Sequence, residues 1–303
     1  MKKRRLVVVF IFAFIVLNLV TFIIAYPEVF RIDPGCCTNH PLAKDFSAYY
    51  TAAWRLFHDP SNTYTKGNVS DGGPVILPQP EPYKYLPSFL FLILPLELLG
   101  YINAIVLFDV IQFLLLVPIA YMLYRLLEER SLAVIAIVSL VVLFQPLPLP
   151  NWGLSVSYYW QWAEGQAKVL DIFLLVLTFY LGQKNRPYVS GIVFGLSAFD
   201  PRFTLIAIPL FLSYNRGKNK QSLIAALSSV VVSNLPLFYP IIGGSFIRMA
   251  LSAGVQTPFY YYAFIPLLTV VSLTVVNRRE IVSTLVAMYR TARRFSARDF
   301  LTK

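Results

Sequence analysis

Long apolar runs recur along almost the whole length of this 303-residue chain. Several of them approach or exceed the roughly 20 residues that cross a bilayer as a helix. Only 14% of the residues are charged and 57% are hydrophobic, a composition that soluble domains of this size do not have. The short alternating segments of a membrane barrel are absent from the sequence. The sequence therefore predicts an all-α, polytopic membrane protein that forms a single domain over residues 1–303.

The basic residues predict how the spans are oriented. Lys and Arg gather at the N-terminus, in short loops and in a basic tail at 277–303, and such clusters stay cytoplasmic. A full crossing by the short run at 86–99, which contains Pro95 and Glu97, would place the later basic loops outside. We therefore expect that run to re-enter the membrane or lie beside it. We therefore predict a multi-pass protein of the cell membrane with both termini cytoplasmic. It has eight spans, or nine if 86–99 crosses. The spans are expected at about 6–26, 102–124, 131–149, 168–183, 187–200, 202–214, 221–240 and 258–276.

Residues 27–85 form the expected first external loop, which is rich in Pro, Gly, Asn and Asp and is close to neutral. Its cysteines, Cys36 and Cys37, are adjacent, which suits neither a relaxed disulfide between them nor a metal site. Asn68 begins a glycosylation triplet, a weak indication of an external position because such triplets often arise by chance. The net charge of +11 thus reflects orientation in a membrane, and nucleic acid is not an expected partner.

A juxtamembrane helix is expected at 45–58 within this loop. At helical spacing its aromatic residues share one broad face, which suits a helix lying in the membrane interface. One carboxylate, Asp45, stands at its start. The simplest role for an acid there is to cap the helix and face its dipole. The residues of the aromatic face are Phe46, Tyr49, Tyr50, Ala53, Trp54 and Phe57.

The expected topology gathers most of the unusual polar residues on the external side. Ionisable groups at membrane depth cost a few kcal/mol, roughly, and usually face a cavity or a partner. Pairing between helices, such as Asp171 with Lys168 or Asp200 with Arg202, explains any one of them. A polar external cavity is the better explanation of the whole set, which comprises Asp45, Lys84, Glu164, Gln166, Lys168, Asp171, Asp200, Arg202 and Arg248, with Asp109 inside a span.

Several common sites have no counterpart in the sequence. There is no Walker loop, no dinucleotide-binding glycine pattern, no Ser/His/Asp arrangement and no zinc spacing. We therefore expect no nucleotide, no metal and no other cofactor. The aromatic clusters at 158–162 and 259–262 read most simply as interface belts, although single rings could stack on a sugar.

Three motifs make the chain resemble the GT-C class of integral-membrane glycosyltransferases, and within it glycosyltransferase family 87, whose members use polyprenol-phosphate mannose. The first is the acidic-aromatic helix that begins at Asp45. The second is Tyr83-Lys84-Tyr85-Leu86-Pro87, followed by Pro95-Leu96. The third is Gly165-Gln166 with the later glycine-containing run at 190–198. The resemblance covers about residues 6–215.

The resemblance implies transfer of a hexose, mannose first among them, from a polyprenyl- or dolichyl-phosphate sugar to a glycan or glycolipid acceptor on the external face. It implies an inverting reaction with a carboxylate of the first external loop as general base, the position of Asp45. The family tends to place a Lys near the position of Arg202, and Arg202, Lys84 and Arg248 are the expected ligands of the lipid phosphate. Further substrate-binding candidates are Tyr49, Tyr85, Gln166 and Glu164.

Two departures from the family pattern leave alternatives open. Asp200 could neutralise Arg202, and family members usually continue through more spans than this chain has. A reduced enzyme, a subunit that needs a partner membrane protein and an inactive relative all fit. The main alternative is a non-catalytic membrane scaffold or lipid-binding subunit of a surface-glycan assembly. A transporter is disfavoured, because the polar groups gather near one face and no inverted repeat is visible.

Overall fold

The computed structural model describes residues 43–64, 85–126 and 165–235, together with Tyr83, Trp162 and a few isolated positions toward either end. This part of the chain is helical and contains no strand, which confirms the all-α prediction for it. Short 3-10 turns lie at Pro60–Asn62 (η1) and Pro87–Phe89 (η2). The helices are α2 (Lys44–His58), α3 (Leu90–Glu97), α4 (Tyr101–Leu126), α7 (Lys168–Gln183), α8 (Pro187–Ser197), α9 (Pro201–Tyr214) and α10 (Asn219–Asn234).

The predicted apolar spans between 102 and 124 and between 168 and 240 coincide with α4, α7, α8, α9 and α10. Within the described residues one helical stretch, Tyr101–Leu123 in α4, is long and apolar enough to cross a membrane. The others are shorter than the roughly 20 residues of a full crossing. The predicted spans 131–149 and 258–276 and most of 6–26 lie outside the described residues. The total of eight spans therefore stays a prediction.

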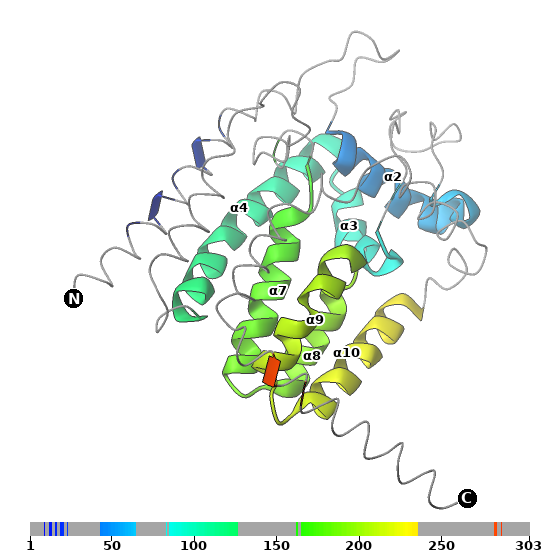
Figure 1. The fold of residues 1–303 in the computed structure, drawn as a ribbon. Coiled ribbons are helices and arrows are strands. Elements are labelled where there is room, and N and C mark those ends of the chain that lie inside the picture. Colours follow the sequence, from blue (N-terminus) through cyan, green and yellow to red (C-terminus); the bar gives the residue numbers. More distant parts are fainter. Residues whose placement is uncertain are drawn as a thin grey trace, which may run out of the picture.

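Local sequence explains where α7 ends and where α8 and α9 begin. Asn185, between α7 and α8, adopts a left-handed backbone conformation with a φ of 61°, which Asn tolerates better than most residues. Pro187 and Pro201 each open a helix, at the first position where proline removes no helical hydrogen bond. Figure 1 shows the resulting arrangement, in which α7 contacts α4, α8 and α9, and α8 packs between α7 and α10.

The contact between α8 and α10 depends on two glycines one turn apart. A Cβ atom on Gly191 would meet the backbone carbonyl oxygen of Ser222, and one on Gly195 would meet that of Ala226. The Ser229 hydroxyl then donates a hydrogen bond of 2.9 Å to the carbonyl of Ile192. Small residues at this spacing let helix backbones approach closely, as in membrane helix pairs. The glycine-containing run recognised in the sequence is thus a helix–helix contact.

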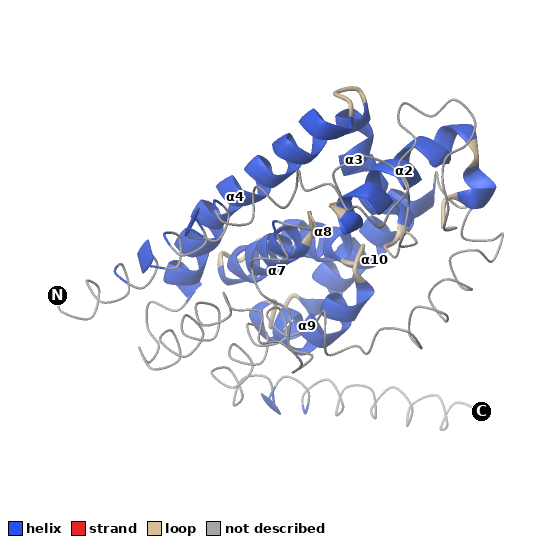
Figure 2. Cartoon of the chain, turned by 90° about the horizontal axis from the view of Figure 1, so that it is seen from above, coloured by secondary structure: helices blue, strands red, loops and turns tan. Residues whose placement is uncertain are grey.

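Helix α2 lies at one end of the other helices, against α3 (Figures 1 and 2). The aromatic face expected to lie in the membrane interface is packed against protein for most of its length, and the placement of the helix at the interface stays a prediction. Phe46 and Tyr49 on one side are buried, and so are Ser47 and Thr51 on the other. Phe57, near its end, is 69% exposed. The helix forms where it was predicted, but α3, α4, Tyr83 and residues 85–89 enclose it and make it a core element.

Candidate active site

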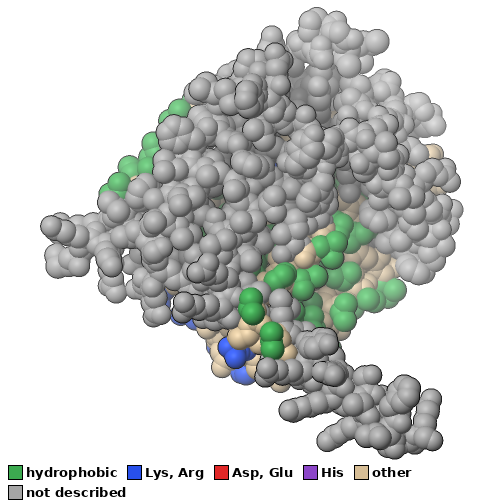
Figure 3. Space-filling model, viewed as in Figure 1, with side chains coloured by type: hydrophobic (Ala, Val, Ile, Leu, Met, Phe, Trp, Pro, Cys, Tyr) green, Lys and Arg blue, Asp and Glu red, His purple; other side chains and the backbone are tan. Residues whose placement is uncertain are grey.

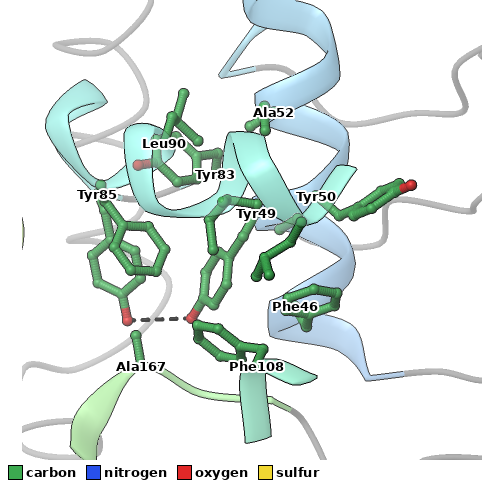
Figure 4. Close-up of a cluster of buried hydrophobic side chains, with 14 of the residues drawn as sticks. Phe46, Tyr49, Tyr50, Ala52, Tyr83, Tyr85, Leu90, Phe108 and Ala167 are labelled. Carbon is green, nitrogen blue, oxygen red and sulfur yellow. Dashed lines mark hydrogen bonds between the residues drawn. The ribbon is translucent and has the colours of Figure 1, made fainter. Parts of the chain in front are cut away.

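The beginning of α2 is surrounded by a cluster of buried aromatic side chains, which we call the aromatic end (Figure 4). They come from segments far apart in the sequence. The cluster therefore fastens α2 to α4, to the segment that precedes α3 and to the segment that follows α8. Ring centroids lie 4.8 to 6.5 Å apart. Apart from the stacked pair of Phe89 and Phe199, the rings meet in tilted or edge-to-face geometry, for example at 5.1 Å between Tyr49 and Phe89. The cluster comprises Phe46, Tyr49, Tyr50, Tyr64, Tyr83, Tyr85, Phe89, Tyr101, Phe108 and Phe199.

A hydrogen bond between two tyrosines lies within the aromatic end. The Tyr49 hydroxyl donates to the Tyr85 hydroxyl at 3.3 Å, and both rings are buried. Figure 4 shows the bonded hydroxyls pointing toward Ala167, at the beginning of α7. Tyr64 donates to the backbone carbonyl of Tyr85 at 3.2 Å. Two of the residues expected to bind substrate, Tyr49 and Tyr85, are therefore brought together, with their rings packed in the protein core.

The aromatic end also contains the turn that leads into α9. The backbone N–H of Leu86 donates to the carbonyl of Phe199 at 2.9 Å. The Phe199 ring stacks on Phe89 at 4.8 Å and meets the edge of Tyr85 at 5.4 Å. Asp200, which follows directly, is fully buried. Arg202 lies in the first turn of α9, and its side chain is outside the described residues. The beginnings of α2 and α9 are thus joined through one set of rings.

Gly165 and Gln166 lie directly against α2 and α4. Gly165 has a φ of +64°, and a Cβ atom placed on it would come within 2.7 Å of the Phe46 Cβ. Only glycine meets both conditions at this position. The Gln112 amide of α4 donates to the Gln166 backbone carbonyl at 2.8 Å. The Gly-Gln motif therefore places the segment before α7 next to Phe46, the neighbour of Asp45.

Three more polar side chains are buried at this end of α4 and α7. Lys168 and Asp171 lie one turn apart at the beginning of α7 and are 8% and 1% exposed. Asp109 of α4, one turn before Gln112, is 1% exposed. Its Oδ1 atom accepts no hydrogen bond within the described part of the chain. The predicted gathering of polar groups on one side of the protein is consistent with these positions.

The pKa of Tyr49 shows the effect of two carboxylates, one from α2 and one from α7. Burial raises the pKa of Tyr49 well above its ordinary value, and neighbouring Tyr85, Asp45 and Asp171 raise it further. Tyr49 therefore remains a neutral hydroxyl. Because both carboxylates act on it, Asp45 of α2 and Asp171 of α7 approach Tyr49 from two separate helices.

Asp45 itself is half-buried in the first turn of α2. The expectation that it caps the helix is wrong, since Ala43 occupies the capping position and no side chain makes a capping hydrogen bond there. The interaction with the helix dipole remains, and it favours the ionised carboxylate. An ionised, half-buried carboxylate can accept a proton from a hydroxyl that reaches it.

Four of the predicted site residues, Lys84, Glu164, Arg248 and the sequon Asn68, lie outside the described residues. Sequence reasoning also missed the roles of Gln112 and Phe199. Gln112 follows Asp109 by three residues in an apolar run, and this helical spacing of polar residues is a signal that could have identified it. Within the described residues no group of His, Cys, Asp and Glu is arranged to hold a metal ion.

One comparison with known proteins gives a match. The model of glycosyltransferase family 87 matches residues 83–246, just over half of the chain. The match includes Tyr85, Gln166 and Arg202 and the helices from α3 to α10, whereas α2 and Asp45 precede it. No curated protein and no solved structure matches the chain significantly.

Proposed function

This chain belongs to glycosyltransferase family 87, and we propose that it transfers a hexose from a polyprenyl- or dolichyl-phosphate sugar to a glycan or glycolipid acceptor. A glycosyltransferase needs a sugar donor and an acceptor. We propose that the donor is lipid-linked, that mannose is its sugar, and that the reaction proceeds on the external face of a multi-pass protein. In this proposal the donor carries its own activated phosphate, so no nucleotide, metal or other cofactor takes part.

Asp45 is the general base in the proposed reaction. The acceptor hydroxyl oxygen forms a bond to the anomeric carbon while the bond from that carbon to the phosphate oxygen breaks. The hydroxyl proton passes to the Asp45 carboxylate, and the electron pair leaves with the polyprenyl phosphate. Attack from the side opposite the leaving group inverts the anomeric configuration. General-base assistance of this kind contributes about 10²- to 10⁴-fold to rate.

The arrangement of the aromatic end carries this proposal. It fastens the first turn of α2, with Asp45, to the first turn of α9, with Arg202, through Tyr49, Tyr85 and Phe199. A base on one side and a cation on the other is what displacement of a phosphate requires, since the leaving group gains negative charge. Arg202, together with Lys84 and Arg248, is the proposed phosphate ligand, because a guanidinium binds phosphate through two parallel hydrogen bonds.

The burial of the surrounding rings supports Asp45 as the base. Tyr49, Tyr83 and Tyr64 are buried and their pKa values are raised by burial, so they stay neutral. Asp45 is the acid of α2 that approaches Tyr49, whereas Asp59 directly follows the last residue of α2 and accepts hydrogen bonds from Ser61 and Asn62. The carboxylates at the two ends of α2 therefore have different surroundings.

Transfer of labelled sugar from dolichyl-phosphate mannose, in membranes that contain the full chain, tests the proposal. Asp45→Asn should lower kcat by at least 10²-fold, roughly the contribution of a general base. Asp59→Asn removes the same charge from the position that follows α2 and should leave kcat within about twofold of the wild type, since Asp59 takes no part in the proposed chemistry. Full activity in a correctly inserted Asp45→Asn variant would exclude Asp45 as the base. A wild-type chain that uses only nucleotide sugars would exclude the lipid donor.

A further inference from the structure

Two turns lie side by side at the end of the helices opposite the aromatic end (Figure 1). One joins α7 to α8 and the other joins α9 to α10. A Cβ atom on Gly182 would lie 3.1 Å from the Tyr214 Cβ, and the Asn215 amide donates to the Ser190 hydroxyl at 3.0 Å. The same amide also donates to the Phe211 carbonyl at 2.9 Å. These contacts hold both turns in one surface.

This surface carries five exposed cations, which we call the basic turns. No Asp or Glu occurs between 172 and 199 or between 201 and 235, so no acid in these ranges offsets them. The acids that flank these ranges, Asp171 and Asp200, lie at the aromatic end. Figure 3 shows Lys and Arg side chains gathered at this edge of the molecule. The five are Lys184, Arg186, Arg216, Lys218 and Lys220.

Exposed apolar side chains begin where the cations end. On α10, Lys220 is followed at helical spacing by Ile224, Leu227 and Val231, which are 53%, 67% and 59% exposed. On α8, Val189, Ile192 and Leu196 form a similar stripe after Arg186. Tyr188, at 57% exposure, lies at the boundary between the two kinds of surface, where tyrosine is enriched in membrane proteins. Each stripe therefore continues from a cation along one side of a helix.

We propose that the basic turns bind the phosphate headgroups of anionic phospholipids, with the acyl chains lying along the apolar stripes of α8 and α10. A cation followed by an apolar stripe is complementary to a molecule with a negative head and a long apolar tail. Clusters of Lys and Arg attract anionic lipid by about 1 kcal/mol per residue near the surface. An acidic peptide would satisfy the cations but leave both stripes exposed. The inference rests on the membrane placement in the proposed function and is independent of its chemistry.

The test uses the full chain in a neutral detergent, without any measurement of sugar transfer. Its thermal unfolding is followed while phosphatidylglycerol or phosphatidylcholine is added. Glycerol phosphate, which has the head without the tail, distinguishes a lipid from a free phosphate. Phosphatidylglycerol should raise the unfolding temperature, and phosphatidylcholine and glycerol phosphate should not.

The decisive variant replaces four exposed cations, Arg186→Gln, Arg216→Gln, Lys218→Gln and Lys220→Gln. Each basic side chain contributes about fivefold, so the apparent affinity for phosphatidylglycerol should fall by at least tenfold. The comparison variant carries the same loss of charge in the C-terminal tail, at Arg290, Arg293, Arg294 and Arg298, and should lose less affinity than the turn variant, because the site is formed by the turns together with the apolar stripes. The turn variant should unfold at the wild-type temperature without lipid, because its substituted side chains are exposed.

Several outcomes would overturn the inference. Equal stabilisation by phosphatidylcholine would show that charge is not recognised, and an unchanged response of the turn variant would place the site elsewhere. Stabilisation by glycerol phosphate as strong as by phosphatidylglycerol would make a soluble phosphate the ligand. Displacement of the lipid by an acidic peptide at lower concentration would make a protein partner the better occupant. None of these results bears on whether Asp45 catalyses transfer.

Discussion

The polar groups at the two ends of α7 have opposite surroundings, buried at one end and exposed at the other. At the aromatic end, Lys168 and Asp171 are buried, and Asp171 raises the pKa of the Tyr49 hydroxyl. At the other end, Lys184 is exposed beside further cations, and residues 172–199 contain no acid. One helix of 16 residues thus connects a buried polar site to a solvated basic surface.

This difference indicates which substitutions the protein tolerates without loss of stability. A buried polar or aromatic group is positioned by many contacts, so its replacement leaves a cavity, a clash or an unmet hydrogen bond. An exposed cation is positioned by few, and its replacement changes the surface potential instead. We expect substitutions at the aromatic end to alter stability and catalysis, and substitutions at the basic turns to alter lipid binding alone.

The strongest test of this comparison replaces one glycine at each end by alanine. Gly165 and Gly217 both have positive φ, +64° and +83°. A Cβ on Gly165 would come within 2.7 Å of Phe46, whereas a Cβ on Gly217 would meet nothing within 4 Å. Gly217→Ala should cost about 1 to 2 kcal/mol of stability from backbone strain. Gly165→Ala should cost that amount plus about 1 to 3 kcal/mol from overpacking.

The measurement is the unfolding midpoint of both variants in the same detergent. Equal losses would mean that Phe46 yields without cost, and the aromatic end would then be less tightly packed than its burial indicates. Transfer activity gives a second comparison, because Phe46 is the neighbour of Asp45. We expect Gly165→Ala to lower kcat and Gly217→Ala to leave it unchanged.

Alkaline pH should unfold the protein through the aromatic end. Burial raises the pKa of Tyr49, Tyr64 and Tyr83 above the ordinary value near 10. In the unfolded chain these tyrosines ionise near pH 10, whereas in the folded protein they keep their protons. Stability is therefore fully present below about pH 10 and falls as the pH rises toward the folded-state pKa values.

Ultraviolet absorbance of tyrosinate, followed together with helix content, measures this effect. Absorbance from the buried tyrosines should appear in step with the loss of helix. Complete ionisation of all tyrosines while the helices persist would contradict the burial of the cluster.

The hydrogen bond between Tyr49 and Tyr85 should matter more for catalysis than for stability. Tyr49→Phe removes a hydroxyl that donates to Tyr85, and Tyr50→Phe on the same helix removes one that donates to the Glu97 carbonyl at 3.1 Å. Each loss should cost about 1 kcal/mol of stability. Of these two bonds, the Tyr49 bond is the one that ties α2 to Tyr85 and so to Phe199, so Tyr49→Phe should lower kcat by about tenfold with little change in KM.

Tyr50→Phe is the control, and it should keep the wild-type kcat. Tyr85→Phe removes the acceptor of the same bond, and combining it with Tyr49→Phe should lower kcat no further than either change alone. Equal kcat values for the Tyr49 and Tyr50 variants would mean that the bond between Tyr49 and Tyr85 does not position Asp45.

The sequence predicted the helices better than it predicted their surroundings. The run expected at 168–183 forms α7 with the same bounds, because polar residues end the apolar stretch on both sides. Burial of α2 could not be predicted, since an aromatic stripe suits a membrane interface and a protein core equally well. Trp162, expected in an interface belt, is fully buried near Phe113 for the same reason.

Long-range contacts account for most of what sequence reasoning missed at the site. Asp45, Tyr49, Tyr85 and Gln166 were identified from short motifs and the family resemblance that these motifs carry, and the structure places them near one another. The bond from Gln112 to Gln166 joins positions 54 residues apart, and the contact of Leu86 with Phe199 spans a still longer stretch of chain. Helical periodicity gives the face of a residue and not the partner that covers it.

The smallest expected effect on stability concerns two arginines. Arg216, in the basic turns, is exposed, whereas Arg55 of α2 is 5% exposed and donates to the Asn62 carbonyl at 3.2 Å. Arg216→Gln should leave the unfolding midpoint unchanged, because an exposed side chain gains little from its neighbours and salt screens its charge. Arg55→Gln should lower it, since the substitution removes a buried donor and packed methylene groups. A shift as large for Arg216 as for Arg55 would mean that the basic turns are part of the folded core, and the division between the two ends of α7 would not hold.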